Sequence, residues 1–281
     1  MTFSDESKNI LYEVRGKIAI IQLNIPKSLN SLTGPQYLYL GQLVQRADAD
    51  PNTLITLLCS SGRYFSAGAN VKNEGFENQS GAKDGDENFL DTTALWMSNF
   101  TARNVWLTQL FLNHSKITVC AMNGPAVGLS AAIVAMCDLI YGMNDSVFLL
   151  TPFASLGLVC EGATSVSLFQ RLGISKANEA LIFSKPVLSK DLYRLGFLNE
   201  LYDFKDTDQF NKKIVDDLEK QMVNLNPNSM LEIKASVRAT YQKNFEVGNV
   251  REAVLGLQKW VAGIPQARFT ELYKGSFKHK L

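Results

Sequence analysis

The sequence alternates short apolar runs with longer helical stretches, and this alternation limits the choice of fold more than any other feature. The apolar runs cover residues 54–59, 117–122 and 139–141, and each is bounded by Gly, Asn or Ser. A compact apolar run without polar alternation is typical of a strand that is buried on both faces. The pattern therefore predicts an α/β fold with buried, partly parallel strands.

The N-terminal segment predicts a hairpin followed by a helix. Residues 10–14 and 18–23 are β-rich runs joined through Arg15 and Gly16, so we expect them to pair. Thr33 is a candidate helix cap, and Pro35 stands in the first turn. Apolar residues then recur at helical spacing, which places one face of this helix on the core.

The last quarter of the chain is expected to be helical. From about residue 206 the strand patterns stop, and amphipathic stretches cover residues 210–223, 229–244 and 250–261. We therefore divide the chain into a core at residues 1–205 and a helical segment at residues 206–281. The helical segment should pack against the core or against a neighbouring subunit.

The composition argues against several classes of function. A formal net charge of +1 over 281 residues gives no general attraction to nucleic acid. No apolar run approaches the ~20 residues that a membrane span needs, and the N-terminus lacks the pattern of a secretion signal. The four cysteines are widely spaced, and two histidines are too few for a metal site or a Ser-His-Asp arrangement.

Residues 72–88 form a segment that is almost wholly polar and rich in glycine. Such a segment has too few apolar groups to offset the entropy that is lost when a chain becomes ordered. We therefore expect a mobile loop there, near the mouth of a ligand site.

Two glycine-bearing turns follow apolar strands and are the candidate ligand-binding features. They read SSGRYFSAGAN at residues 60–70 and NGPAVGLSAA at residues 123–132. Small residues let a ligand approach the main chain, and a helix that begins near Leu129 would direct its positive end at that ligand. Either turn alone is commonplace. Their joint occurrence favours a ligand site.

Four motifs together resemble the enoyl-CoA hydratase/isomerase (crotonase) superfamily, and most closely its fungal peroxisomal Δ3,Δ2-enoyl-CoA isomerases. The motifs are PKSLNSL at residues 26–32, FSAGA at 65–69, NGPAVG at 123–128 and LGLVCEG at 156–162. The resemblance spans nearly the whole chain. It implies an α/β crotonase fold, a spiral of ββα units, with a C-terminal helical segment that mediates trimer formation.

The resemblance assigns a role to two backbone amides. Members of the family bind the thioester oxygen with two N–H groups, and the matching residues here are Ala69, after Gly68, and Leu129, after Gly128. Removal of a proton next to a thioester builds negative charge on the carbonyl oxygen. Preorganised donors in a dry pocket stabilise the enolate, typically by ~3–4 kcal/mol per donor.

The resemblance also places the catalytic base. Relatives that hydrate the double bond use two glutamates, which match Ala132 and Phe153 here, so hydration is not expected. Glu161 stands where the fungal isomerases carry their catalytic glutamate, and one carboxylate suffices for isomerisation. Burial should raise the pKa of this glutamate. Without the family pattern, Glu161 is equally an acid at a helix N-terminus.

Asn104 matches an asparagine that holds the catalytic carboxylate or a water in the fungal isomerases. A lone asparagine in a helix is more often a surface residue. We therefore keep both a supporting role for Asn104 and a purely structural one.

Coenzyme A is expected as part of the substrate, and the resemblance implies no metal or redox cofactor. Lys27 matches a region that often meets the nucleotide phosphates, although an exposed lysine is commonly just solvated. The carbonyls around Ser66 and Ala67 would face the adenine. Gly68 and Gly128 complete the binding turns.

The expected reaction converts 3-cis or 3-trans enoyl-CoA into 2-trans enoyl-CoA in the β-oxidation of unsaturated fatty acids. Two alternatives stay open: a Δ3,5-Δ2,4-dienoyl-CoA isomerase, and a catalytically silent member of the superfamily that binds acyl-CoA.

The C-terminus reads His279-Lys280-Leu281, a variant of the Ser-Lys-Leu tripeptide that a peroxisomal import receptor recognises. The expected location is the peroxisomal matrix. The expected partners are an acyl-CoA substrate, the import receptor and further copies of the chain, in a trimer or a dimer of trimers.

Overall fold

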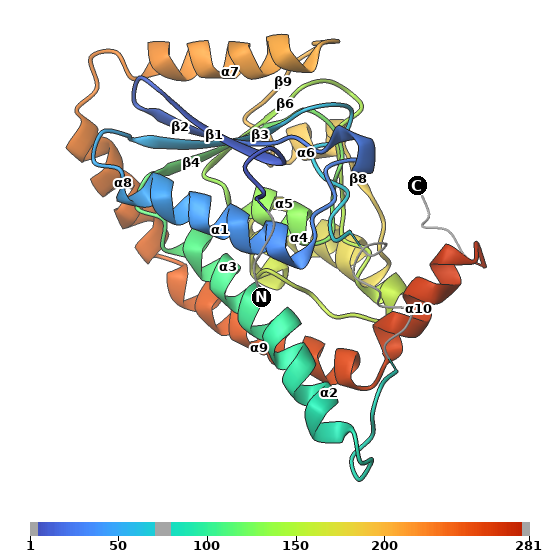
Figure 1. The fold of residues 1–281 in the computed structure, drawn as a ribbon. Coiled ribbons are helices and arrows are strands. Elements are labelled where there is room, and N and C mark those ends of the chain that lie inside the picture. Colours follow the sequence, from blue (N-terminus) through green and yellow to red (C-terminus); the bar gives the residue numbers. More distant parts are fainter. Residues whose placement is uncertain (1–4, 71–79, 277–281) are drawn as a thin grey trace.

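A six-stranded sheet forms the centre of the computed structural model, which describes residues 5–70 and 80–276 (Figure 1). Its strands, in spatial order, are β1 (Ile10–Arg15), β2 (Ile18–Leu23), β3 (Ile55–Ser60), β4 (Ile117–Met122), β6 (Leu139–Gly142) and β9 (Glu200–Leu201). β1 and β2 pair as the predicted antiparallel hairpin, and every later pair is parallel. The predicted strands are therefore confirmed.

A second sheet of three strands has the order β5 (Ala126–Val127), β7 (Phe148–Leu150), β8 (Val187–Leu188). β5 pairs with β7 in parallel, and β7 pairs with β8 in antiparallel. Because β5 directly precedes Gly128, this small sheet carries the second glycine turn.

Helices cover both faces of the large sheet. The α-helices of the described residues are α1 (Gly34–Ala49), α2 (Phe89–Trp96), α3 (Arg103–Leu112), α4 (Leu129–Met136), α5 (Thr164–Ile182), α6 (Ser189–Arg194), α7 (Thr207–Gln221), α8 (Pro227–Ala239), α9 (Gln242–Val261) and α10 (Ile264–Tyr273). Shorter helical turns are η1 (Pro26–Ser28), η3 (Met97–Ala102) and η4 (Ala154–Leu156). Figure 1 shows α7 on one side of the sheet and α1, α3, α4 and α5 on the other.

The inner strands β2, β3 and β4 bury side chains on both faces, as their apolar runs predict, whereas the edge strand β1 is largely exposed. Ile21 and Leu58 enter a core shared with α1, α3, α4 and α5. Ile18 and Leu57, on the opposite face, pack with Phe210 of α7 in a second core. Neighbouring residues along a strand point to opposite faces of the sheet. Because helices cover both faces, apolar residues can follow one another without a polar residue between them.

The predicted N-terminal helix is α1, and its first turn shows why it begins where it does. The hydroxyl of Thr33 accepts from the N–H of Gln36 at 3.4 Å, and the N–H of Thr33 donates to the side chain of Gln36 at 3.0 Å. This reciprocal pair satisfies two amides that a helix start leaves without partners.

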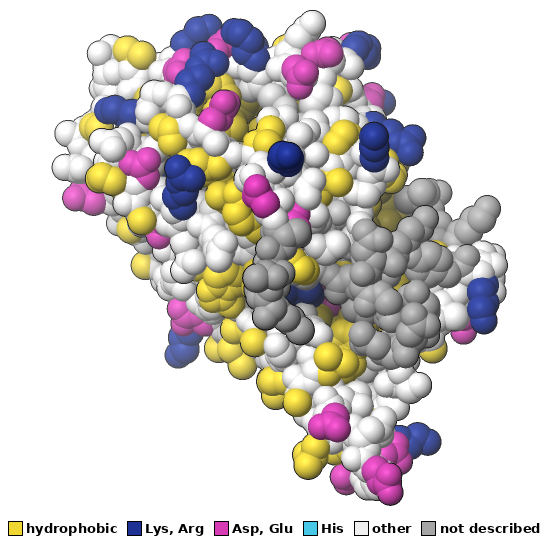
Figure 2. All heavy atoms as spheres, viewed as in Figure 1, with side chains coloured by type: hydrophobic (Ala, Val, Ile, Leu, Met, Phe, Trp, Pro, Cys, Tyr) yellow, Lys and Arg dark blue, Asp and Glu magenta, His cyan; other side chains and the backbone are white. Residues whose placement is uncertain are grey.

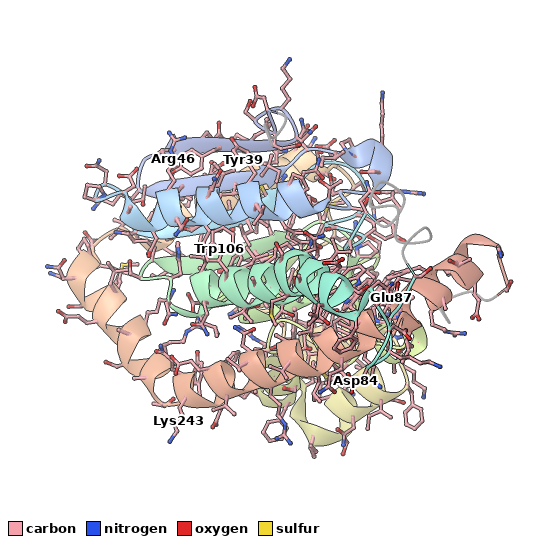
Figure 3. The ribbon with its side chains drawn as sticks, turned by 60° about the horizontal axis from the view of Figure 1, so that its bottom comes forward. Tyr39, Arg46, Asp84, Glu87, Trp106 and Lys243 are labelled. Carbon is pink, nitrogen blue, oxygen red and sulfur yellow. The ribbon has the colours of Figure 1, made fainter. Side chains whose placement is uncertain are left out.

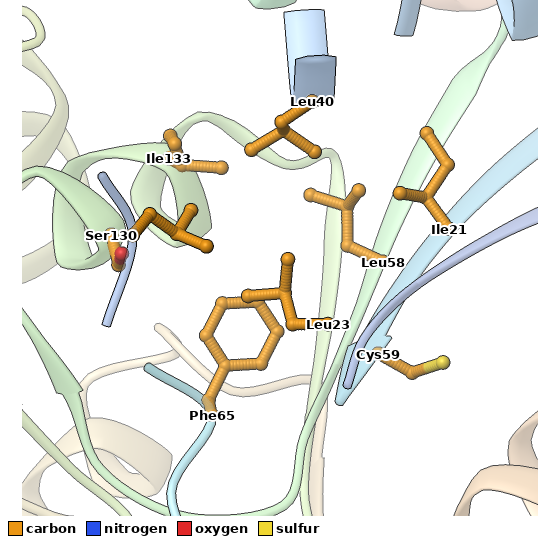
Figure 4. Close-up of a pocket in the computed structure, with 9 residues that line it drawn as sticks. Ile21, Leu23, Leu40, Leu58, Cys59, Phe65, Ser130 and Ile133 are labelled. Atoms are coloured by element: carbon orange, nitrogen blue, oxygen red, sulfur yellow. The ribbon is translucent and has the colours of Figure 1, made fainter. Parts of the chain in front are cut away.

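An apolar pocket lies between α1, the large sheet and α4 (Figure 4). Its lining residues are Ile21, Leu23, Leu32, Leu40, Leu58, Cys59, Phe65, Ser130 and Ile133. Phe65 belongs to the first glycine turn and Ser130 to the second, so both turns are anchored in this part of the core.

The C-terminal helices differ from the prediction in two places. The stretch predicted at residues 229–244 is broken at Tyr241, where Arg238 lies 5.7 Å from the ring and Phe245 packs at 5.4 Å between centroids. α10 was not predicted. It follows Gly263, a left-handed residue with φ +74°, and Pro265 stands in its first turn, which is a recognisable start signal.

Two sequence predictions lie wholly or partly outside the described residues. The C-terminal tripeptide at 279–281 is one, and residues 72–79 of the polar segment are the other. The described end of that segment is attached to the C-terminal helices, because the N–H of Ala82 donates to the carbonyl of Val261 at 2.8 Å.

The surface carries charges of both signs, as the small net charge predicts. Figure 2 shows basic and acidic side chains interspersed on one face, with apolar side chains between them. Within residues 5–70 and 80–276, no helix combines the length and apolar character needed to cross a bilayer.

Candidate active site

The two glycine turns lie side by side because a short parallel bridge joins them. The N–H of Ser66 donates to the carbonyl of Pro125 at 3.2 Å, and the N–H of Val127 donates to the carbonyl of Ser66 at 2.9 Å. Gly68 has φ +84°, and a Cβ there would lie 2.7 Å from the carbonyl oxygen of Val127. Only glycine permits this approach.

The N–H of Ala69 is directed away from the neighbouring chain. Leu32 donates to the carbonyl of Gly68 at 2.9 Å, and Asn70 donates to the carbonyl of Leu32 at 2.8 Å. The carbonyl of Gly68 and the N–H of Ala69 belong to the same peptide group, and in a trans peptide these two groups point in opposite directions. Its amide therefore faces the other side, toward the cleft that Ala69 lines.

The N–H of Leu129 is available for a different reason. Leu129 is the first residue of α4, and the first amides of a helix have no intrahelical acceptor. Gly128 precedes it with φ 61° and ψ −131°, and the carbonyl of Gly128 accepts from Ala132 at 3.2 Å. The helix thus holds one peptide plane rigidly and presents its N–H to the cleft, with the positive end of the helix dipole behind it.

Ser66 braces the first turn from within. It is fully buried, its hydroxyl donates to the carbonyl of Asn30 at 2.7 Å, and it shares a 2.7 Å hydrogen bond with Ser130 of α4. The N–H of Gly68 donates to the same hydroxyl at 3.2 Å. Asn30 in turn binds the carbonyls of the first turn at Ser61 and Tyr64, at 2.7 and 2.9 Å.

Glu161 lies in a tight segment just before α5. Gly162 and Ala163 both adopt left-handed conformations, with φ 65° and 58°. A Cβ at Gly162 would lie 2.6 Å from the Cβ of Ala132, so the segment packs directly on the first turns of α4. This packing brings Glu161 to the cleft that Ala69 and Leu129 also line.

Asn104 and Glu161 form a buried pair. Nδ2 of Asn104 donates to Oε2 of Glu161 at 3.3 Å, and the two residues are 3% and 9% exposed. Oδ1 of Asn104 accepts from Nε of Arg103 at 3.3 Å, which orients the amide so that its NH₂ group faces the carboxylate. The structure therefore brings Asn104 to the predicted base.

Burial raises the pKa of Glu161 to about 7. The positive charge of Arg103 and the hydrogen bond from Asn104 lower this pKa, whereas the negative charge of Glu252 raises it. A carboxyl whose pKa lies near neutrality can both accept and return a proton at the operating pH.

The cleft has an empty volume of about 770 Å³ that includes open solvent. The two glycine turns, Arg103 and Glu161 contribute polar groups to its lining. The apolar part is lined by Phe100, Phe153, Leu156, Leu158, Trp260, Phe269 and Leu272. Such a cleft suits a ligand with a polar reacting group and an extended hydrocarbon chain.

Only some of the residues expected to contact coenzyme A line the cleft. Ala67, Gly68 and Gly128 line the cleft, whereas Lys27 is exposed on η1, outside the lining. The carbonyl of Ser66 accepts from Val127, and its side chain is enclosed. In the described part of the chain, no group of three or more His, Cys, Asp or Glu side chains is arranged to hold a metal ion.

Sequence reasoning missed several residues of the cleft. Arg103 had a detectable signal, because it stands beside Asn104 and no other Asp, Glu, Lys or Arg occurs in residues 92–115. Trp260, Phe269 and Leu272 had none, because they belong to C-terminal helices whose expected task was oligomerisation. Trp260 stacks on Trp96 at 4.2 Å between ring centroids and closes this side of the cleft.

Known proteins resemble this chain in sequence and in fold. The 3,2-trans-enoyl-CoA isomerase of Saccharomyces cerevisiae is 38% identical over 278 residues, which cover 98% of each chain. A Delta(3,5)-Delta(2,4)-dienoyl-CoA isomerase of the same yeast is 38% identical over 276 residues, 98% of this chain and 100% of the relative. Its namesake from Pyricularia oryzae is 39% identical over 280 residues, 96% and 98% of the two chains.

Among solved structures, an enoyl-CoA hydratase/isomerase from Pseudoalteromonas atlantica superposes with a TM-score of 0.79 at 20% identity. The match covers 98% of this chain and all of the other, and it supports the fold alone. Residues 13–259 match the sequence model of the enoyl-CoA hydratase/isomerase family. The chain therefore belongs to the enoyl-CoA hydratase/isomerase family and has the crotonase fold.

Proposed function

We propose that the protein is an enoyl-CoA isomerase that moves a 3-cis or 3-trans double bond of an acyl-CoA thioester to the 2-trans position. The observation that carries this proposal is the cleft shared by the buried carboxylate of Glu161 and by Ala69 and Leu129, whose backbone amides can bind the thioester oxygen. The relative from Saccharomyces cerevisiae that is named 3,2-trans-enoyl-CoA isomerase supports it.

The proposed mechanism needs one proton carrier. Glu161 removes the proton from C2, the electrons of that C–H bond delocalise into the thioester, and the charge on its oxygen is held by the N–H groups of Ala69 and Leu129. Protonation of C4 by the same carboxyl then leaves a double bond between C2 and C3. The proton is conserved within the substrate, so the proposed reaction requires no redox cofactor.

Hydration of the double bond is disfavoured by the residues that stand where hydrating relatives carry acids. Phe153 lines the cleft as an apolar wall, and Ala132 packs against the segment of Glu161. Neither side chain can orient or activate water, and one carboxylate does not do both tasks.

A second candidate is the isomerisation of 3,5-dienoyl-CoA to 2,4-dienoyl-CoA. It is favoured by the two fungal relatives of that name, which are as similar to this chain as the mono-enoyl isomerase. The same amides would hold the thioester oxygen, but this proton moves from C2 to C6, and Ala132 and Phe153 offer no second acid to carry it, which argues against this candidate. Ultraviolet spectra of products from 3-hexenoyl-CoA and from a 3,5-dienoyl-CoA distinguish the two substrates.

The test of the proposal is turnover of 3-hexenoyl-CoA by the wild type and by Glu161→Gln. We expect kcat of Glu161→Gln to fall by about 10²- to 10⁴-fold because the base is lost. The dissociation constant of a saturated acyl-CoA should change little. The exposed Glu232→Gln serves as the control. A wild type that binds acyl-CoA without turnover would instead be a silent member of the superfamily.

For coenzyme A we propose that Ala67 contacts the ligand through its backbone and that Lys27 approaches the phosphates from η1. Ala67 lines the cleft, and the exposed ammonium of Lys27 is unhindered by burial. For Ser66 we propose support of the turn in place of direct contact with adenine, because its side chain is enclosed.

We further propose a homotrimer or a dimer of trimers located in the peroxisomal matrix. Helix α9 presents an exposed apolar face formed by Val247, Val250, Val254 and Leu255, which a neighbouring subunit would cover. The C-terminal His279-Lys280-Leu281 and a mouse relative named as peroxisomal support the location. Residues 1–205 then form the catalytic core, and residues 206–281 contribute helices to the cleft and to assembly.

A further inference from the structure

Helix α9 contacts both segments that carry the catalytic pair. It packs against α3, which bears Asn104, and against α5, which follows Glu161. Figure 3 shows α9 running beside α3 over much of its length. A helix in this place can set the separation of the two segments.

The contact with the segment of Glu161 is made by Glu252. This residue is 5% exposed, and its Oε1 accepts from the N–H of Ser165 at 2.9 Å, in the first turn of α5. One turn earlier on α9, Gly248 lies so close that a Cβ would stand 2.9 Å from Cγ2 of Val166. The absence of a side chain at Gly248 lets α9 reach the turn that follows the base.

The contact with the segment of Asn104 is made by Asn249. It is 1% exposed, and its Nδ2 donates to the carbonyl of Val105 at 3.2 Å. Val105 is the residue next to Asn104 in α3. A single stretch of α9 therefore makes hydrogen bonds on both sides of the Asn104–Glu161 pair.

We propose that Glu252 and Asn249 are positioning residues that hold Asn104 and Glu161 at their working separation. The proposal rests on the proposed function of Glu161 as the base. It gives the C-terminal segment a task in catalysis that is separate from assembly.

The charges around Glu161 support this proposal. The negative charge of Glu252 raises the pKa of Glu161, and the cation of Arg103, on α3, lowers it. Burial raises the pKa of Glu252 itself, while the amides at the start of α5 lower it. Burial raises the pKa of the adjacent Cys160 thiol to about 11, so this thiol is neutral in the working range.

Two variants separate the charge of Glu252 from its hydrogen bond, and a third tests Asn249. Glu252→Gln keeps an acceptor for Ser165 and removes the charge, so the acid limb of the kcat profile should move to lower pH. Glu252→Ala removes both and should lower kcat by about 10- to 100-fold with KM little changed, because small displacements of a catalytic group are costly. Asn249→Ala should also lower kcat. In a protein that already carries Asn104→Ala, the same change should lower kcat by a smaller factor than it does in the wild type.

The matched control is Glu232→Gln, on the neighbouring helix α8, whose side chain is exposed. It should leave kcat and the pH profile unchanged. If Glu252→Gln and Asn249→Ala fold and match the wild type in kcat, KM and acid limb, the proposal is wrong. A loss of thermal stability without a change in these values would show a merely structural role and would also overturn it.

A measurement without substrate separates this proposal from the proposed function. The pKa of the Glu161 carboxyl can be followed by ¹³C NMR in the free enzyme, with Glu161→Gln to assign the signal. Glu252→Gln should shift that pKa downward. An unchanged pKa contradicts the proposal, whereas an absence of turnover by the wild type contradicts only the function assigned to Glu161.

Discussion

Oε2 of Glu161 accepts a hydrogen bond from Nδ2 of Asn104 at 3.3 Å, between residues 57 positions apart in the sequence. Both side chains are buried, so little water competes for the carboxylate. The amide stabilises the ionised form and burial stabilises the neutral form. Their balance decides the pH at which the cleft contains a working base.

Removal of the amide should make Glu161 harder to ionise. In Asn104→Ala the pKa of Glu161 rises, because the hydrogen bond that lowers it is gone. We expect the acid limb of kcat/KM to move to higher pH and the rate at pH 7 to fall by about 10-fold, one hydrogen bond to a charged group being worth about 1.5–3 kcal/mol. The measurement is the pH dependence of 3-hexenoyl-CoA turnover.

The control for this prediction is Asn113→Ala at the C-terminal end of the same helix. Asn113 is exposed and donates to the carbonyl of Gln109 at 3.1 Å. It should leave the pH profile in place. An acid limb that moves to lower pH in Asn104→Ala would contradict the hydrogen-bond arrangement.

The raised pKa of Glu161 should appear as a cost to stability at high pH. A carboxyl with pKa about 7 in the folded state, against 4.5 normally, contributes stability that is present below pH 4.5 and is lost as pH rises through 7. Glu161→Gln cannot ionise, so at pH 8.5 it should exceed the wild type by up to about 3 kcal/mol, and at pH 4.5 by much less.

Denaturant unfolding of both proteins at the two pH values measures this difference. Glu232→Gln is the control, since its side chain is exposed and folding does not remove it from water. Equal effects of Glu161→Gln at both pH values would show that Glu161 is ionised without penalty.

A side chain at Gly68 should separate the two amides. In Gly68→Ala the new Cβ meets the carbonyl of Val127, so the first turn moves away from β5. We expect kcat/KM to fall by roughly 10²-fold, the usual consequence of losing one oxyanion donor. Steady-state kinetics with 3-hexenoyl-CoA checks the result.

Gly196→Ala isolates the backbone effect of the Gly68 change. Gly196 has φ +77°, and nothing lies within 4 Å of a Cβ built there. It should lose about 1–2 kcal/mol of stability from the left-handed conformation and keep its activity. If Gly68→Ala keeps full activity, the amide of Ala69 does not act at the thioester.

Charges on the exposed face of α9 should weaken assembly. Val250 and Val254 are 52% and 49% exposed, and Val250→Asp with Val254→Asp would place two charges in an apolar contact. We expect the mass measured by light scattering to fall to that of the monomer. Lys190→Asp, on an exposed residue of α6 away from this face, should not change it. A wild type that is already monomeric would refute the proposed trimer.

Much of the fold could be predicted from short stretches of sequence. The hairpin of β1 and β2 follows from two β-rich runs and Gly16, and the start of α1 follows from Thr33. The end of α8 was not predicted, because the amphipathic pattern continues across the break at Tyr241. Tyr241, at that break, packs against the main core, and this is a tertiary contact that the local pattern does not contain. α10 was also missed, although Gly263 and Pro265 mark its start.

The candidate site divides in the same way. The family motifs indicated Ala69, Leu129 and Glu161, and the structure places all three on one cleft. The apolar wall that Trp260 contributes was not predicted, and neither was the contact of Glu252 with Ser165. These residues have no local signature, because their roles depend on which helix packs beside which.

By itself the sequence determined the strands, the capped helix and the two glycine turns, because each depends on the backbone sterics and side-chain chemistry of a few adjacent residues. Only the tertiary structure decided that Asn104 is buried, that its amide meets Glu161, and that α9 contacts both segments. Burial and separation are properties of the packed chain. They set the pKa of Glu161, and for this reason that pKa could not be predicted from a local sequence pattern.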